Sequence, residues 1–149
     1  MIADGCGTAS VDLGRMVGGA PLALDEILVG SVATASTSSR ITDSAAGATA
    51  MASGVKTANR MVGVDPSGRR LPTVLERARE RGMATGLVVK STMTDATPAC
   101  FAAHVMGRGA QDTIAVQEID GGVDLLLGGG RDWFLPLSRA AACARTAST

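Results

Sequence analysis

The amino-acid sequence predicts an α/β fold in which a mostly parallel sheet is flanked by helices as a three-layer sandwich, incomplete in this chain. The first observation is the order of the predicted elements, because short apolar strands alternate with helices. The second is composition, since 46% of the residues are apolar but only 2% are aromatic. The core must therefore consist of small and aliphatic side chains, which suit close packing of helices on a sheet.

The first third of the chain contains one strand end and one helix. Residues 1–4 are predicted as the last residues of a strand, followed by a tight glycine turn at 5–7. The Ser/Thr-rich stretch at 34–39 is predicted as a loop. Residues 45–53 are rich in Ala and are followed by Gly54, which is typical of a helix that ends at a glycine.

The middle of the chain contains the clearest helix, at residues 72–81. Pro72 suits its first turn, and Gly82 follows it as a stop signal. The remaining apolar patterns predict buried strands at 84–89 and 123–127 and helices at 98–106 and 112–119. Ligands of parallel sheets gather at the carboxyl ends of the strands, so polar residues that follow these strands are candidate site residues.

Residues 1–137 are predicted to be part of one domain, and residues 138–149 an atypical tail. The tail consists of Ala, Arg, Ser, Thr and one Cys, with no apolar period. Two explanations stay open: a frayed, disordered tail, or out-of-frame translation. A half-finished sheet is also expected to expose apolar edges and to favour association or poor solubility.

Charge and cysteine content exclude several classes of function. The 14 basic and 14 acidic residues cancel, so no strongly basic nucleic-acid surface is expected, and the arginines of 60–81 are interpreted as solvated. The odd number and wide spacing of Cys6, Cys100 and Cys143 argue against a disulfide framework and a Cys-rich zinc site. No apolar run approaches the roughly 20 residues of a membrane span, and no signal peptide is recognisable.

Ser44, at the start of a predicted helix, is the strongest candidate site residue. A serine at such a position is most often only a helix cap. Here small residues follow it, so the helix N-terminus would offer backbone N–H groups and a favourable dipole to an anion. Asp43, which precedes it, fits beside a phosphate only if its carboxylate orients a cation.

The segment Asp-Ser-Ala-Ala-Gly-Ala-Thr-Ala at 43–50, followed by Gly-Val-Lys-Thr at 54–57, resembles the nucleophile segment of alkaline phosphatases. The resemblance implies metal-assisted hydrolysis of phosphate monoesters, in which Ser44 is phosphorylated as a covalent intermediate. It also implies that Asp43 helps to position a phosphate-binding arginine.

Two further segments resemble metal motifs of the same family. Ile-Ala-Asp-Gly-Cys-Gly at 2–7 is similar to a motif usually written Gly-Asp-Gly-Met-Gly, which implies that Asp4 bridges a zinc and a magnesium ion. Thr-Asp-Ala-Thr-Pro-Ala at 94–99 implies Thr97 as a magnesium ligand and Asp95 near that ion. Carboxylate and hydroxyl oxygens are the ligands that a hard cation prefers.

The family's phosphate-clamping arginine corresponds to Arg108, and the glycine-rich segment 125–130 corresponds to a structural one. A planar guanidinium grips two phosphate oxygens at once, which suits this role better than a lysine would. Zinc would lower the pKa of the Ser44 hydroxyl, which is the fourth implied metal ligand. In all, the resemblance covers roughly residues 1–136.

One geometric requirement follows from these assignments. Thr97 and Arg108 would be about 16 Å apart along an unbroken helix. If both face one pocket, the segment between them must bend or end early, and Gly107 is the expected place. His104, in the same apolar segment, is interpreted as a hydrogen-bonded core histidine with no catalytic role.

The resemblance implies Zn²⁺ and Mg²⁺ as cofactors and phosphate monoesters as substrates. It also implies a periplasmic or secreted protein, with the export signal upstream of residue 1, and a homodimer in the full-length family. The alternative is a truncated, non-catalytic remnant. A catalytic zinc needs about three protein ligands, whereas Asp4 is the only zinc-ligand candidate besides Ser44, and the single histidine is not one of the family's ligands.

Overall fold

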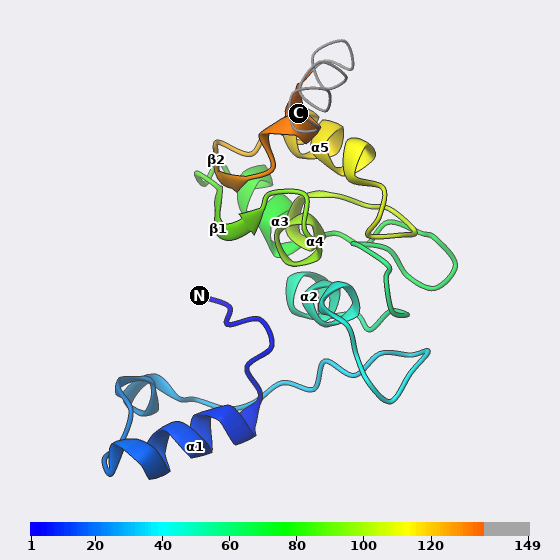
Figure 1. Cartoon of the computed structure of the whole chain (residues 1–149). Coiled ribbons are helices and arrows are strands. Elements are labelled where there is room, and N and C mark those ends of the chain that lie inside the picture. Colours follow the sequence, from blue (N-terminus) through cyan, green and yellow to red (C-terminus); the bar gives the residue numbers. More distant parts are fainter. Residues whose placement is uncertain (136–149) are drawn as a thin grey trace, which may run out of the picture. The chain divides into compact units, whose positions relative to one another are not determined.

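The computed structural model describes residues 1–135, which fall into two compact units: Met1–Ala33, and a second unit that begins at Thr34 (Figure 1). The predicted domain boundary at residue 137 and the predicted tail lie outside the described residues. Among residues 1–135, no helix is long and apolar enough to cross a membrane.

The first unit contains helix α1 (Thr8–Gly18) and the short 3-10 helix η1 (Ala23–Ile27). Residues 1–3 are irregular and run into a turn at Asp4 and Gly5. The predicted strand end is therefore wrong, whereas the predicted glycine turn is confirmed. The physical reason is that this unit holds no other strand with which those residues could form a ladder.

Helix α1 has weak sequence signals, and the sequence pattern does not predict it. Gly7 precedes it without a capping side chain, and no acidic residue lies in its first turn. Gly19 ends it in the left-handed conformation and donates its N–H to the carbonyl of Arg15. The Arg15 guanidinium Nε then donates to Asp25 at 3.1 Å, which ties α1 to η1.

The core of the second unit lies where helix α2 (Ser44–Ser53) packs against helix α4 (Ala96–Ala102). Helix α2 ends, as predicted, at Gly54, which is left-handed. Small side chains at the contact let the two backbones approach closely, which confirms the kind of core that the composition predicts. The buried cluster consists of Ala45, Ala48, Val62, Ala96, Ala99, Cys100, Ala103, Val105 and Ile114.

Helix α3 (Val74–Glu80) begins at a capping box rather than at a proline. The Thr73 hydroxyl accepts from the Glu76 amide at 3.1 Å, and the Glu76 carboxylate accepts from the Thr73 amide at 2.8 Å. Pro72 therefore precedes the cap, and its predicted place in the first turn is wrong. Gly82 follows the helix with φ 72°, as a stop residue should.

Two parallel strands, β1 (Gly86–Thr92) and β2 (Leu125–Gly129), form the sheet, and helix α5 (Gln111–Asp120) lies between them in the chain (Figure 1). The 3-10 helix η2 (Arg131–Phe134) follows β2. The parallel pairing confirms the predicted α/β order. Its register joins Gly86 to Leu125, Leu87 to Leu126 and Val88 to Leu127.

The strands are not buried, contrary to prediction. Val88 is 70% exposed, and Leu125 and Leu127 are 48% and 52% exposed. Within residues 1–135 the sheet has only these two strands, so each has an unpaired edge and much of its apolar surface is uncovered. The expected exposure of apolar sheet surface is therefore observed.

Helix α4 ends at Ala102, where the chain turns into an extended segment. Ala103 has φ −136° and ψ 159°, so the expected early end is confirmed, but its expected place at Gly107 is wrong. The cause is a long-range pairing. Val62 and Val105 form an antiparallel bridge with N–H···O distances of 2.9 and 3.0 Å, which draws the chain away from the helix axis.

Candidate active site

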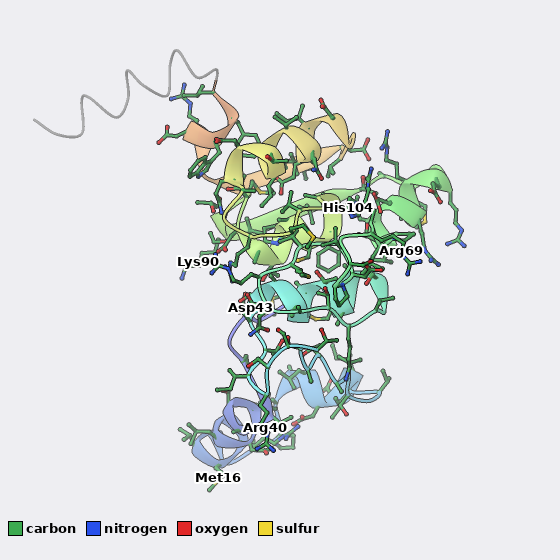
Figure 2. The ribbon with its side chains drawn as sticks, turned by 90° about the vertical axis from the view of Figure 1, so that its right-hand side faces the viewer. Met16, Arg40, Asp43, Arg69, Lys90 and His104 are labelled. Carbon is green, nitrogen blue, oxygen red and sulfur yellow. The ribbon has the colours of Figure 1, made fainter. Side chains whose placement is uncertain are left out.

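Ser44 is the first residue of α2, and Asp43 is its N-cap. The Asp43 Oδ1 atom accepts from the Ala46 amide at 2.9 Å, which satisfies one of the open N–H groups of the first turn. Figure 2 shows Asp43 at the N-terminal end of α2. Ser44 is half-buried, and the residues that follow it are buried. The helix dipole therefore favours negative charge at this serine.

Arg108 connects the starts of two helices. Its Nη2 atom lies 2.8 Å from Asp95 Oδ1, and its Nη1 atom lies 3.7 Å from Asp43 Oδ2. Asp95 is the N-cap of α4 and accepts from the Ala96 amide at 2.8 Å. The guanidinium is thus held between the capping carboxylates of α2 and α4, one of which belongs to the residue that precedes Ser44. The structure brings Asp43, Asp95 and Arg108 together.

Thr97 and Asp4 complete the predicted site residues. Thr97 is the second residue of α4, directly after the helix start that Asp95 caps. Asp4 lies in the exposed turn of the first unit, so its place near Thr97 stays a prediction. Among residues 1–135, no group of three or more His, Cys, Asp and Glu side chains is arranged to hold a metal ion.

The backbone of Arg108 is held by residues that belong to none of the sequence motifs. Its carbonyl accepts from Gln111 Nε2 at 2.9 Å, and the Gln111 side chain accepts in turn from the buried hydroxyl of Thr94. Its amide donates to the carbonyl of Arg60 at 2.8 Å. The contacts of Gln111 with Thr94 and of Arg108 with Arg60 join segments that are well separated in the sequence, so a local pattern could not have revealed these two contacts.

His104 is a structural residue, as predicted. Its ring contacts the Gly63 carbonyl through Nδ1 at 2.6 Å and the Glu76 carboxylate through Nε2 at 2.9 Å, and its side chain is 2% exposed. Burial opposes ionisation of Glu76, but hydrogen bonds from Thr73 and His104 outweigh it and hold the pKa of Glu76 below its ordinary value. Both ring nitrogens are engaged, so His104 is not available to a metal.

A buried thiol, that of Cys100, contacts the backbone of the residue that follows Ser44. The Cys100 Sγ atom is 3.2 Å from the carbonyl of Ala45 and 3.2 Å from the Thr49 hydroxyl. Burial raises the pKa of Cys100 to about 11, which makes it an inert packing residue rather than a nucleophile. Cys6 and Cys100 are both free thiols, and Cys143 lies outside the described residues.

Together these contacts define a class of site. A serine at a helix N-terminus, an adjacent guanidinium oriented by two carboxylates, and nearby hydroxyl and carboxylate oxygens form an arrangement that suits phosphate ester chemistry. The neighbouring histidine and cysteine take no part in it.

The alkaline phosphatase family model matches residues 1–148, and the chain belongs to the alkaline phosphatase family. An alkaline phosphatase of Schizosaccharomyces pombe is 46% identical over 155 residues, which cover 96% of this chain and 29% of that protein. The chain thus spans less than a third of that curated relative.

Solved structures agree with the family and with an incomplete α/β fold. The cold-active alkaline phosphatase of a psychrophilic Shewanella species matches with a TM-score of 0.85 and 35% identity, over 98% of this chain and 39% of that one. A mutant alkaline phosphatase of the Antarctic bacterium TAB5 with bound Mg matches with a TM-score of 0.79 and 34% identity, over 89% and 39%.

Proposed function

We propose that the protein of which this chain forms part hydrolyses phosphate monoesters, with Ser44 carrying the phosphoryl group as a phosphoserine. The observation that supports this most directly is Arg108, held beside the serine by Asp43 and Asp95. A guanidinium there can bind two oxygens of a phosphate while the serine oxygen approaches phosphorus.

Each residue has a defined part in that reaction. Asp43 keeps Ser44 at the start of α2 by capping the helix, and it attracts one side of the Arg108 guanidinium. Asp95 attracts the other side, so the guanidinium is oriented before a phosphate arrives. The N-terminal end of the α2 dipole favours the negative charge of the phosphate and of the phosphoserine.

The oxygen ligands fit magnesium better than zinc. Asp95 and Thr97 lie at the start of α4. Ser44 lies at the start of α2, and Arg108 contacts the cap residues of both helices, Asp43 and Asp95. Such oxygen donors suit Mg²⁺. A bound cation would lower the pKa of the serine hydroxyl and offset charge on the phosphate.

The donor set does not fit a catalytic zinc. Zinc needs about three protein ligands, usually including histidine, and His104 is bonded to Gly63 and Glu76. This observation favours a second candidate, a non-catalytic polypeptide that keeps the phosphate-binding residues. We therefore expect this chain alone to turn over slowly or not at all.

The experiment separates binding from turnover. The purified chain, with zinc and magnesium at alkaline pH, is tested for binding of inorganic phosphate and for hydrolysis of a chromogenic phosphate monoester. Binding that is lost in Arg108→Ala supports the proposed site, and absence of binding in the unmodified chain contradicts it. Robust turnover lost in Ser44→Ala but kept in Ser53→Ala, at the other end of α2, would overturn the non-catalytic candidate.

Of these residues, Ser44 and Arg108 would contact the phosphoryl group directly, and none would contact the alcohol of the ester. A periplasmic or secreted location and a homodimer remain predictions from the family resemblance. Both are tested on the full-length protein, by fractionation of cells and by the mass of the purified protein in solution.

A further inference from the structure

Arg60 has an unusual backbone. Its φ is 72°, and it is the only residue other than glycine with positive φ among residues 1–135. For a residue with a Cβ atom, the left-handed conformation is unfavourable because the Cβ atom lies too close to the following carbonyl oxygen. The Arg60 side chain is exposed, so packing of this side chain does not explain the conformation.

The backbone contacts of Arg60 do explain it. Its N–H donates to Asp43 Oδ2 at 3.0 Å, and its carbonyl accepts from the Arg108 amide at 2.8 Å. One residue thereby joins the cap before the nucleophile to the phosphate-clamping arginine. In an extended or right-handed conformation the two peptide groups that flank this residue would be turned differently, and both contacts could not be kept.

Asn59 adds contacts to the segment that precedes the serine, so residues 59 and 60 together form a bridge between that segment and Arg108. Its Oδ1 atom accepts from the Asp43 amide at 3.1 Å, and its Nδ2 atom donates to the Ile41 carbonyl at 2.9 Å. Its own amide donates to the Ser38 hydroxyl at 3.0 Å. The segment that leads into Ser44 is therefore held from the same turn that holds Arg108.

We propose that the turn at Asn59 and Arg60 is a positioning element that sets the distance between Ser44 and Arg108, and that it acts through the backbone conformation of residue 60 and not through its guanidinium. This inference rests on the proposed function of those two residues. Strained residues persist where the surroundings over-determine them, often next to functional groups. Here the fixed groups are the Asp43 carboxylate and the Arg108 backbone.

The test separates conformation from side chain at position 60. Arg60→Gly deletes the guanidinium but favours positive φ, whereas Arg60→Val deletes it and disfavours positive φ. Arg60→Ala is an intermediate variant in case the valine protein does not fold, and Arg77→Ala, at an exposed position of α3, is the matched loss of charge. The ligand-free proteins are compared by hydrogen exchange of the Arg108 amide, and then by binding of inorganic phosphate.

The Arg108 amide should be equally protected from hydrogen exchange in the unmodified chain, Arg60→Gly and Arg77→Ala. These three proteins should also bind phosphate with affinities within about two-fold of each other. Arg60→Val should lose that protection and bind phosphate at least about ten-fold more weakly, with Arg60→Ala between them, because small displacements of a positioned group are costly. Equal amide protection in the glycine and valine proteins would overturn the proposal. So would an equal loss of phosphate binding in both, since the guanidinium would then be responsible.

If the unmodified chain binds no phosphate, the proposed function fails while the bridge is still judged by amide exchange. If phosphate binds equally well to the valine variant despite its lost amide protection, the positioning role fails while the proposed function stands.

Discussion

Glu118, on helix α5, gives the sharpest prediction about stability. It is fully buried, and neither of its carboxylate oxygens has a hydrogen-bond partner among the described residues. Burial raises the pKa of Glu118 to about 8, because the ionised form would lie in an apolar environment without compensation. Folding therefore opposes ionisation of this side chain over most of the neutral pH range.

The sign and size of the effect follow from linkage. The pKa of Glu118 is higher in the folded chain than its ordinary value of 4.5, so the unfolded chain loses its proton first as the pH rises. Stability is unaffected by this group below about pH 4.5, falls between about pH 4.5 and 8, and is then constant. At 1.36 kcal/mol per pKa unit, the loss between pH 5 and pH 8 is about 3.5 kcal/mol.

Glu118→Gln removes this titration while keeping the size of the side chain. Urea unfolding of both proteins, followed by circular dichroism near pH 5 and near pH 8, gives the difference between their free energies of unfolding. We expect the advantage of the glutamine variant to grow by about 3.5 kcal/mol at the higher pH. The lowered pKa values of Asp65 and Asp124 act only below about pH 4 and are common to both proteins.

A difference between the two proteins that stays constant across this range would refute the reasoning. It would mean that Glu118 is hydrated or paired in solution and that its folded pKa is near 4.5.

Two further predictions concern a glycine and a thiol. Gly63 has φ 58°, and a Cβ atom there would lie 2.2 Å from the Ala103 carbonyl oxygen, so Gly63→Ala should cost at least about 2 kcal/mol in urea unfolding. Gly54→Ala, with φ 76° but open space around it, should cost only about 1 kcal/mol; equal costs would contradict the steric argument. Iodoacetamide at neutral pH should modify exposed Cys6 and spare Cys100 until urea unfolds the chain, and similar rates in the native chain, measured by peptide mass spectrometry, would refute the burial argument.

Local features of the fold were predictable from the sequence. Helix α2 and its glycine stop at Gly54 follow from an alanine-rich run, and the extent of α5 differs by one residue at each end from the predicted 112–119. Each signal lies within the element it defines, so neighbouring residues suffice to recognise it. The sequence pattern places the start of α3 two residues too early, because the capping box at Thr73 outweighs the preference of Pro72 for the first turn.

Features that depend on distant segments were not predictable. The end of α4 at Ala102 depends on the bridge between Val62 and Val105, more than forty positions apart in the sequence. The motif resemblance names Arg108, but not the Arg60 carbonyl that holds its backbone. The predicted burial of the strands is also wrong. An apolar run indicates that its side chains favour burial, but it does not indicate that the described residues form a layer that covers them.

The contacts of Arg108 explain why the helix caps of the site are carboxylates and not hydroxyls. A serine or threonine would cap either helix equally well, but it would leave no negative charge for the guanidinium. Asp43 uses one oxygen for the Ala46 amide and the other for the Arg60 amide and Arg108. Asp95 uses a single oxygen for both its helix and the guanidinium. Because each carboxylate fixes a helix start and the arginine together, the geometry of Ser44 and Arg108 depends on the same atoms that begin α2 and α4.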